Sequence, residues 1–557
     1  MRVAVVPGPT SGCWLSELAN DENGHGPVVQ HDDLCAAVAE RERAPGVRWV
    51  WPAAGQVYPT LLQAGVRVAR CHDVALVEAL LLAREGRGGE PASLAGAWAR
   101  LRGGPIPAAR AQQREAGQAA LFDADPDFPS PAAALEALLA VHAGQLRRIA
   151  ADEHAARFAL LATAESACGL VAGEMGFNGL PWRADVHDAL LTDLLGPRPV
   201  PGMRPGRLAA LAAQIASAFG GRQVNPDSPA QVLRAFAADG MRVPSTRSHV
   251  LRQVDHPAVP LLLEYKELAR LYTAHGWAWL DEWVTDGRFR PEYVVGGVVS
   301  GRWASRGGGA LQIPRVLRRA VVADPGWVLV VADAAQLEPR VLAALAGDEA
   351  LAAAAGTGDL YEALAGAFGG DRAKAKIAML SAMYGGAAGE ARQLLAILRN
   401  RFPLAARYVE AAARAGEEGR VVRSRLGRTC PPPSAAWRGL TASPDDPAGD
   451  GLAAGRSLRA RGRFTRNFVV QASAADWATV LLADLRARLA RRGDGEAGRL
   501  VFFQHDEVIV HCPQARAQEV VGIIGESAEA AGRLVFGPGP VRFPVTTAVV
   551  TSYADAK

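Results

Sequence analysis

The chain has 557 residues, too many for one compact core, and at roughly 150 residues per domain this length predicts about three or four domains. Hydrophobic residues make up 49% and charged residues 21% of the sequence, which is typical of a soluble globular protein. The formal net charge of +4 does not by itself indicate a nucleic-acid-binding protein. No run of about 18 uncharged apolar residues occurs, and the apolar start of the chain is short, so neither a membrane span nor a secretory signal is expected.

The cysteines lie far apart in the sequence and include no Cys-x-x-Cys pair. This spacing excludes a zinc ribbon and argues against a disulfide framework. We expect reduced, mostly buried thiols in a cytoplasmic protein. The residues concerned are Cys13, Cys35, Cys71, Cys168, Cys430 and Cys512.

In chain order, short apolar runs predict strands, and Ala-rich segments with apolar residues at helical spacing predict helices. The predicted strands are 2–6, 293–299, 319–323, 327–333, 500–504 and 507–511. The predicted helices are 132–170, 205–218, 341–356 and 470–492. Pro and Gly residues punctuate two further stretches, about 103–131 and 441–457, which predicts loops or linkers there. Helices should therefore dominate, with a small sheet in the second half of the chain.

Positive charge is concentrated in one part of the chain. Residues 392–466 hold fifteen Arg, no Lys and six acidic residues, a net charge of +9 against +4 for the whole chain. A polyphosphate partner requires a cationic stretch of this kind, although a solvated Arg-rich surface would give the same count.

Two separate segments each place a carboxylate at the end of an apolar strand. The run 327–333 is continuously apolar up to Asp333, and burying a carboxylate there is costly unless a cation or hydrogen bonds receive it. The later segment 500–510 has two apolar halves around His505, Asp506 and Glu507, which predicts a β-hairpin with these residues at its turn.

If these strands pair, Asp333 and Asp506 become neighbours, and two like charges held close together require a metal. Two divalent ions about 3.5–4 Å apart suit in-line phosphoryl transfer. Mg²⁺ is the expected ion, because it prefers one or two carboxylates together with substrate phosphates. Taken singly, Asp333 could instead be a helix cap and His505-Asp506 an ordinary turn.

A third segment carries two cations and an aromatic ring at four-residue spacing. Arg372, Lys376, Leu380 and Tyr384 would form one stripe along an α-helix. The cations could hold a triphosphate, with a guanidinium fork from Arg and a point charge from Lys, and the second half could hold a nucleobase. A surface helix with one amphipathic stripe is the alternative.

The three segments together resemble motifs A, B and C of the family A DNA polymerases, the DNA polymerase I family. The patterns are D-x-x-Q-x-E-x-R from Asp333, R-x-x-x-K-x-x-x-L-x-x-x-Y-G from Arg372, and Q-H-D-E from Gln504. Other family-like segments are 263–266, 300–305 with 311–314, and 463–476. The resemblance extends from about Glu174 to Val550, which is two-thirds of the chain.

The resemblance implies an α+β multidomain fold shaped as a polymerase right hand, with helical thumb and fingers and a small antiparallel palm sheet. An N-terminal α/β domain similar to a degenerate 3′–5′ exonuclease would precede it, and no 5′-nuclease domain is expected. The implied parts are the exonuclease-like domain 1–160, thumb 161–290, first palm segment 291–345, fingers 346–440 and second palm segment 441–557.

The resemblance also implies a role for individual residues. The proposed catalytic carboxylates are Asp333 and Asp506, both metal ligands, and the neighbouring Glu507. The implied nucleotide-binding residues are Gln336, Glu338, Tyr361, Arg372, Lys376, Leu380 and Tyr384. Among them Glu338 would be the steric gate that excludes a sugar 2′-OH. The implied DNA-binding residues are Arg302, Arg463, Asn467, Gln471 and His505. Minor-groove contacts by this set would test base-pair shape without reading sequence.

The implied reaction is attack of a primer 3′-OH on the α-phosphate of a dNTP, assisted by two Mg²⁺ ions or by Mn²⁺. The expected partners are primer–template DNA and dNTPs, with the chain acting as a monomer away from membranes, in repair or gap filling rather than bulk replication. Two alternatives stay open: a non-catalytic primer–template binder that has kept the cleft, and an RNA polymerase or primase-like enzyme, which Glu338 disfavours.

Four positions depart from the family pattern. Leu380 stands where the family usually has Phe or Tyr, Ser381 where it has Gly, Tyr361 where it has His, and Ala334 where a Tyr is common. An aliphatic side chain at 380 should contact the base and sugar more weakly than a ring does. We therefore expect altered nucleotide affinity with catalysis retained.

The first 160 residues lack the residues that exonuclease chemistry needs. They contain no Asp-x-Glu pair, and their one tyrosine, Tyr58, is followed by Pro59 and by no carboxylate four residues later. The segment Cys71-His72-Asp73 is either a remnant of that site or a buried thiol, a surface His and a helix cap. The sequence predicts a domain without proofreading activity, although relatives of this short form are named bifunctional.

Overall fold

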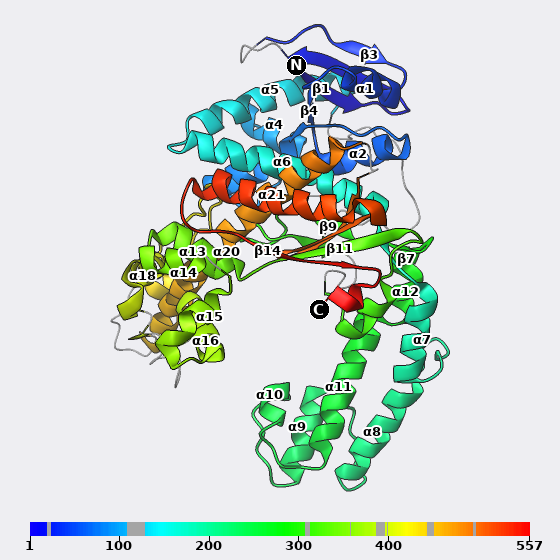
Figure 1. Cartoon of the computed structure of the whole chain (residues 1–557), viewed down its shortest axis with the longest axis vertical. Helices are drawn as coiled ribbons and strands as arrows, with labels where there is room; N and C mark the ends of the chain where they lie inside the picture. The colour runs from blue at the N-terminus through cyan, green and yellow to red at the C-terminus, as the bar shows by residue number, and fades with distance from the viewer. Residues whose placement is uncertain are drawn as a thin grey trace. The chain divides into compact units, whose positions relative to one another are not determined.

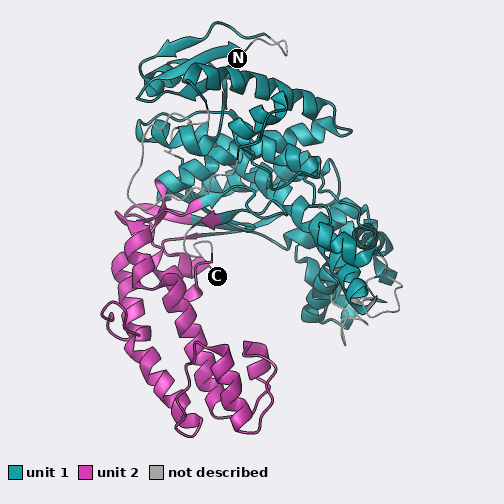
Figure 2. Ribbon diagram, turned by 180° about the vertical axis from the view of Figure 1, so that it is seen from behind, with its two compact units in different colours: residues 1–177, 293–304, 330–548 teal, residues 178–292, 305–329, 549–557 magenta. Residues whose placement is uncertain are grey.

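The protein is described here by a computed structural model, and the described residues are 1–18, 24–107, 128–306, 312–356, 358–385, 396–397, 399–442, 451–493 and 497–556. The chain is a mixed α/β protein that divides into two compact units (Figures 1 and 2). Unit 1 comprises residues 1–177, 293–304 and 330–548, and unit 2 comprises residues 178–292, 305–329 and 549–557. Each unit is built from segments that are far apart in the sequence.

The N-terminal part of unit 1 is a five-stranded sheet with helices on both faces. Its strand order is β3-β2-β1-β4-β5, in which β1 pairs parallel with β4 and antiparallel with β2. The strands are β1 (Arg2–Pro7), β2 (Cys13–Leu18), β3 (Val29–His31), β4 (Arg48–Trp51) and β5 (Cys71–Asp73). The helices are α1 (Leu34–Glu42), α2 (Ala54–Gln63), α3 (Val74–Arg84), α4 (Leu94–Arg102), α5 (Pro131–Ala150) and α6 (Ala155–Asn178).

Alternate residues of β1 serve two separate cores. Val3 and Val5 pack with α1 and α2 on one face, whereas Ala4 and Val6 pack with α4 and α5 on the other. Because both faces are covered, β1 and β4 are apolar almost throughout, as buried parallel strands usually are. Of this sheet the sequence pattern predicted one strand, 2–6, which is β1, and it missed the other four. Strands β2 to β5 have three to six residues, too few to show a clear period.

A second sheet, most of whose residues belong to unit 1, has four strands in the order β12-β13-β11-β14. Its strands are β11 (Trp327–Ala334), β12 (Arg499–Gln504), β13 (Glu507–Pro513) and β14 (Val545–Val550). The antiparallel β12–β13 hairpin and β11 occupy the residues predicted for them. A long, mainly helical segment separates β11 from the β12–β13 hairpin in the sequence, so these strands are neighbours only in space.

The helices of that insertion begin and end at clear signals. They are α13 (Leu337–Ala346), α14 (Glu349–Ala355), α15 (Leu360–Ala365), α16 (Arg372–Tyr384), α18 (Pro403–Glu417), α19 (Ala435–Thr441) and α20 (Gly451–Ala490), with α21 (Ala517–Phe536) after the hairpin and a 3₁₀ turn η2 (Gly366–Phe368) before α16. The helix predicted at 341–356 is two helices, because Gly347 ends α13 with a φ of 62° and Asp348 caps α14.

Several other predicted boundaries also differ from the structure. The helix predicted at 132–170 is interrupted at 151–154, between α5 and α6, and the domain boundary predicted at residue 160 falls inside α6. Residues 451–457 of the predicted linker belong to α20, and 443–450 lie outside the described residues, as do 108–127 of the other predicted linker.

Unit 2 is mainly helical. Its helices are α7 (Ala184–Leu195), α8 (Gly206–Ala218), α9 (Pro229–Ala238), α10 (Ser248–Leu251), α11 (Ala258–His275) and α12 (Trp277–Trp283), with 3₁₀ turns η1 (Arg315–Ala320) and η4 (Tyr553–Ala556). Three short strands form a sheet, β6 (Leu180–Pro181), β8 (Arg288–Phe289) and β7 (Val284–Thr285). The helix predicted at 205–218 is α8.

Two strand predictions were wrong in whole or in part. Residues 319–323 contain the end of η1 and one isolated bridge, at Val322, because Pro314 leads the chain into a 3₁₀ turn. Of residues 293–299, only the first two belong to a strand, β9 (Glu292–Val294), which pairs with β10 (Ala304–Arg306). Gly296 then turns the chain with a φ of 60°.

Two helices are long and apolar enough to cross a membrane by length and composition, α6 and residues 452–490 of α20. The most apolar windows of these helices are 50% and 83% buried inside the protein. A core helix of a globular protein passes the same test, so this finding is weak evidence for a membrane span.

Candidate functional site

Asp333 and Asp506 are brought together by the pairing of β11 beside the β12–β13 hairpin. Asp333 is the penultimate residue of β11, and Asp506 lies in the two-residue turn between Gln504 and Glu507. The backbone N–H of Ala334 donates a hydrogen bond of 3.1 Å to the carbonyl oxygen of Asp506. His505 enables the tight turn by adopting a φ of 57°. The two carboxylates therefore occupy one edge of the sheet, as the sequence suggested.

The charge of this pair is only partly compensated. Burial and, second, the neighbouring Asp333 raise the pKa of Asp506 to about 6, while Arg302 acts in the opposite direction. Burial and a second carboxylate both disfavour the charged form of Asp506, so a cation bound here would be stabilised. Hard oxygen donors of this kind fit Mg²⁺, which takes few protein ligands and keeps waters or substrate oxygens. Within the described ranges, no group of three or more His, Cys, Asp or Glu side chains could hold a metal.

Glu507, expected as a third acid, is buried at the start of β13 opposite Gln504. His505, beside the pair, is exposed on the turn. Partial burial of its ring and, second, the charge of Arg302 lower the pKa of His505. The turn thus carries the half-buried Asp506 and the exposed His505, whereas Glu507 is buried within the strand ladder.

Glu338 is held from two sides. Arg302 donates a hydrogen bond to one carboxylate oxygen and the hydroxyl of Tyr384 to the other. Gln471 in turn donates to Tyr384, whose pKa is raised to about 12 by burial and by its bond to Glu338. Four residues expected at the nucleotide or DNA site, from four different segments, therefore form one hydrogen-bonded chain.

The stripe predicted on α16 exists. Arg372 and Lys376 are exposed, Leu380 and Tyr384 are half-buried, and Ala375 lies on the buried opposite side. A side-chain cap by Asp371 begins the helix, and Gly385 ends it with a φ of 76°.

Arg372 already has an anionic partner in the protein. Its guanidinium donates two hydrogen bonds, of 3.0 and 2.6 Å, to Oδ2 of Asp359, and it lies 5.6 Å from the centre of the Tyr361 ring. Asp359 also caps α15 and accepts a 2.7 Å hydrogen bond from Gln336. Gln336 itself sits in the left-handed region with a φ of 52° and accepts from the N–H of Leu360. An incoming phosphate must compete with Asp359 for Arg372.

Arg463, Asn467 and Gln471 share one face of α20 at four-residue spacing. Arg463 is exposed and the other two are half-buried. A Cβ at Gly385 would lie 3.1 Å from Arg463, so the end of α16 approaches this face closely. The side-chain oxygen of Asn467 is buried without a hydrogen-bond partner among the described residues, which suits a polar ligand.

Sequence reasoning gave no role to three buried charged residues near this site. Arg340 is fully buried and donates to the carbonyl oxygens of Ala335 at 2.9 Å and Arg542 at 3.2 Å, as well as to those of Ala355 and Gly358. Arg428 and Asp476 form a buried ion pair. Nothing in the sequence distinguishes a buried Arg from the solvated ones around it, although Arg340 does stand in the first motif.

The segment Cys71-His72-Asp73 is entirely internal. Asp73 caps α3 and accepts a 2.6 Å bond from the N–H of Ala54, and burial raises its pKa to about 6. The expectation of a surface His was wrong: His72 is buried and donates to Gln145 across 2.8 Å. Cys71 is a buried thiol and Asp73 a helix cap, as expected if this segment is not a remnant of an exonuclease site.

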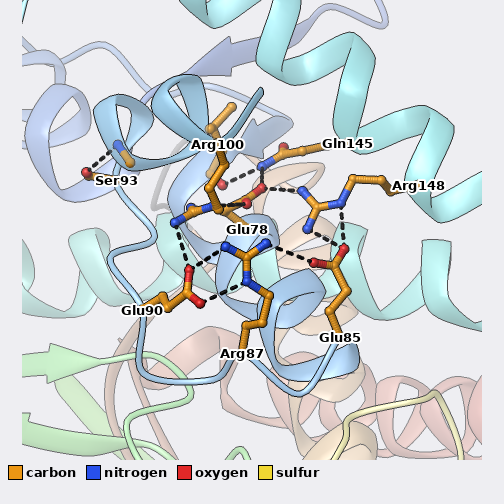
Figure 3. A network of polar contacts seen from close by, with 10 residues as sticks. Glu78, Glu85, Arg87, Glu90, Ser93, Arg100, Gln145 and Arg148 are labelled. Carbon is orange, nitrogen blue, oxygen red and sulfur yellow. Dashed lines mark hydrogen bonds and ion pairs between the residues drawn. The ribbon is translucent and has the colours of Figure 1, made fainter. Parts of the chain in front are cut away.

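A network of ion pairs extends from Gln145 across three helices (Figure 3). Its centre is Glu78, whose side chain is 1% exposed and accepts from Arg100, Arg148 and Gln145. Each carboxylate in it has an arginine partner, so the network stabilises the packing of α3, α4 and α5 and offers no pair of acids for a metal.

The chain matches the family model described as DNA polymerase family A over residues 205–555. The thermostable DNA polymerase I of Thermus filiformis is 29% identical over 307 residues, which are 49% of this chain and 34% of that protein. The DNA polymerase I of Chloroflexus aurantiacus is 29% identical over 311 residues, or 50% of this chain and 31% of that protein. The match thus spans about a third of the length of these relatives.

A solved structure, the POL domain of Pol1 from M. smegmatis in complex with DNA primer-template and dNTP, has the same fold with a TM-score of 0.71. The two share 20% sequence identity, and the superposition covers 100% of this chain and 95% of that chain. The family model covers well over half of the sequence, including all three motifs that meet around Asp333 and Asp506. The chain therefore belongs to DNA polymerase family A.

Proposed function

We propose that this protein is a template-directed DNA polymerase that adds dNTPs to a primer 3′-OH. The observation that carries the proposal is that Asp333 and Asp506 lie close together, where the end of β11 meets the hairpin turn. Burial and the second carboxylate raise the pKa of Asp506 there to about 6. A protein that only binds DNA gains nothing from two crowded acids, because both repel phosphate.

Asp333 and Asp506 would hold two Mg²⁺ ions. When bound, these ions lower the pKa of the attacking hydroxyl and stabilise the departing pyrophosphate. Lys376 and Arg372 would bind the triphosphate, Arg372 after it has exchanged Asp359 for phosphate. Leu380 and Tyr384 would contact the base, with Tyr361 beside the phosphate-binding arginine.

Glu338 would act as the steric gate against a sugar 2′-OH, because Arg302 and Tyr384 fix its carboxylate in place. Arg463, Asn467 and Gln471 would follow the primer and template along α20, and His505 would lie at the primer end. The orphaned oxygen of Asn467 supports this placement, since a buried acceptor without a partner is costly until a donor reaches it. Thumb, fingers and palm would correspond to 161–290, 346–440 and the two palm segments, as the resemblance implies.

We also propose that the N-terminal domain has no proofreading activity and that the protein works as a cytoplasmic monomer in gap filling or repair. In support, Asp73 is committed to a helix cap, and Glu78 is committed to arginine partners.

The test is extension of a labelled primer with Mg²⁺ and either dNTPs or rNTPs, scored for synthesis and for shortening. Wild type should extend with dNTPs and should not shorten a mismatched primer. Asp506→Ala should lose at least about a thousandfold in kcat while still binding the duplex. The matched control Asp484→Ala, an acid paired with Arg488 on α20, should keep activity. Tight duplex binding without extension would favour the non-catalytic binder, and efficient rNTP use would favour an RNA-synthesising enzyme.

A further inference from the structure

Helix α6 of unit 1 reaches the loop 295–303, which joins β9 to β10 and carries Arg302. Helix α6 presents two glutamates, Glu165 at 3% and Glu174 at 7% exposure, and each receives one buried arginine from the later part of the chain. Glu174 accepts from Arg486 at 2.7 Å, and Glu165 accepts from Arg428. Helix α6 thus holds two similar buried ion pairs. The Glu165 pair contacts the loop that carries Arg302, whereas Arg486 of the Glu174 pair donates to the backbone of Val68 and Ala69.

The Glu165 pair is a complete charge-assisted network. Arg428 donates to both oxygens of Glu165, at 3.3 and 2.9 Å, and its Nε lies 3.4 Å from Oδ1 of Asp476 on α20. The other oxygen of Asp476 accepts a 3.0 Å bond from the N–H of Leu426. Arg428 is 6% exposed and Asp476 is fully buried, so the guanidinium has one fixed position.

This guanidinium lies directly against the backbone of the Arg302 loop. A Cβ placed on Gly301 would meet Nε of Arg428 at 2.2 Å and its Cζ at 2.4 Å, and one placed on Gly296 would meet Oε1 of Glu165 at 2.6 Å. Both glycines have positive φ, of 84° and 60°. Within the loop, Gly301 donates to Val298 at 2.7 Å. The backbone of Gly296 therefore contacts Glu165, and the backbone of Gly301 contacts Arg428, so closely that neither position has space for a side chain.

Arg302 follows Gly301. Its guanidinium donates a hydrogen bond to Glu338, and its positive charge lowers the pKa of Asp506. On the other side, Trp303 stacks edge-on against Phe503 of β12, with ring centres 5.3 Å apart. The loop is thus fixed between the buried ion pair and the hairpin that carries Asp506. The direction of the Arg302 side chain depends on both supports.

We infer that Glu165 and Arg428 are positioning residues for Arg302, and that α6 thereby links the N-terminal domain to the primer end. The same helix packs against the N-terminal domain through Gly169, where a Cβ would lie 3.0 Å from Ala54, and Gly173, where it would lie 3.0 Å from Tyr58. A domain that has lost nuclease residues retains a function as the support of this helix. The inference rests on the proposed polymerase function for its kinetic consequences, but not for its structural ones.

The experiment compares Glu165→Gln with the matched control Glu174→Gln, each alone and combined with Arg302→Ala. Both glutamine variants weaken a buried Arg–Glu pair on α6, so both should lower the thermal midpoint, and kinetics are measured where all variants are folded. Glu165→Gln should lower kcat/KM for dNTP addition about tenfold, and Glu174→Gln by less than about twofold. In the Arg302→Ala background, Glu165→Gln should have little further effect, because residues that act through one another are non-additive.

Hydrogen exchange of residues 293–304 gives a readout that needs no activity. Exchange there should be about tenfold faster in Glu165→Gln and unchanged in Glu174→Gln. Full additivity of Glu165→Gln with Arg302→Ala, or equal exchange in the two glutamine variants, would overturn the inference. A wild-type protein that extends no primer would refute the proposed function, while the exchange comparison still decides the positioning role.

Discussion

Ala334 donates its backbone N–H to the carbonyl of Asp506 at 3.1 Å, and this bond between the end of β11 and the hairpin turn places Asp333 next to Asp506. A shift of one residue along β11 would turn Asp333 to the other face of the sheet. The apolar residues before it, Val328 to Ala332, are all buried, which fixes that register strongly. The cost of the arrangement is the repulsion between two carboxylates.

That repulsion predicts opposite effects of Asp506→Asn on stability with and without metal. Without metal, Asp506→Asn should raise the thermal midpoint, by an amount corresponding to about 1 kcal/mol, because it removes one of two crowded charges. Wild type should gain roughly 1.4 kcal/mol at a Mg²⁺ concentration ten times the Kd. Asp506→Asn should gain much less. Thermal unfolding in EDTA and in MgCl₂ measures both effects, and an equal Mg²⁺ response in the two proteins would contradict this assignment.

Lys376→Ala is expected to raise the KM for dNTPs by about tenfold to a hundredfold, since a point charge to the triphosphate is lost. The matched control is Lys374→Ala, two residues earlier on the same helix and off the stripe, which should change KM by less than about twofold. Arg372 should contribute less than Lys376, because binding phosphate costs it the pair with Asp359. Steady-state kinetics of single-nucleotide addition test the order of these effects, and equal losses for both lysines would argue against a triphosphate site on this face.

The residues of the candidate site could be predicted from the sequence, but the residues that hold them in position could not. Apolar runs that end in Asp333 and Asp506, and the four-residue spacing on α16, follow directly from strand and helix geometry, and the structure assembles them as expected. The Asp359 partner of Arg372 is invisible in sequence, because an acid that caps a short helix looks like any loop acid. Likewise Arg428 lies within an arginine-rich stretch, and only packing decides which of fifteen arginines is buried.

Leu380→Phe is expected to lower the KM for dNTPs several-fold and to improve the use of dideoxynucleotides. A ring offers a flat surface for the base and sugar, and aromatic stacking on a base contributes roughly 1–3 kcal/mol. Leu380 is half-buried on the exposed side of α16, so part of a larger side chain would face solvent. Ile377→Phe, at an exposed position off the stripe, is the control and should change neither quantity. Unchanged dNTP affinity and dideoxynucleotide use in Leu380→Phe would refute the interpretation of this position.

Arg340→Lys should destabilise the protein by about 3 kcal/mol. Arg340 is fully buried and donates to four backbone carbonyls, of Ala335, Ala355, Gly358 and Arg542, which a lysine with one ammonium group cannot all reach. Each buried carbonyl left unpaired costs about 1–3 kcal/mol. Arg414→Lys, on the exposed part of α18, should change the thermal midpoint little. A midpoint for Arg340→Lys equal to that of Arg414→Lys would show that these hydrogen bonds contribute no net stability.

The buried histidines of the N-terminal sheet domain predict a loss of stability in acid. Burial lowers the pKa of His72 to about 4 and that of His142 to about 2, and their rings meet edge-on at 4.7 Å. Between pH 6.5 and 4 the unfolded state therefore binds more protons than the native state, so the free energy of unfolding falls as the pH falls. Asp73, whose pKa is raised to about 6, acts in the opposite direction between pH 6 and 4.

His142→Phe isolates the histidine contribution, because Asp73 is common to both proteins and cancels in the comparison. The variant keeps an aromatic ring against His72 but removes one titrating group, and it should lose about 2–3 kcal/mol less stability than wild type between pH 7 and pH 4. His154→Gln, at an exposed position after α5, is the control and should follow the wild-type pH profile. Thermal midpoints measured across this pH range decide the matter: if His142→Phe declines as steeply as wild type, the acid sensitivity arises elsewhere in the chain.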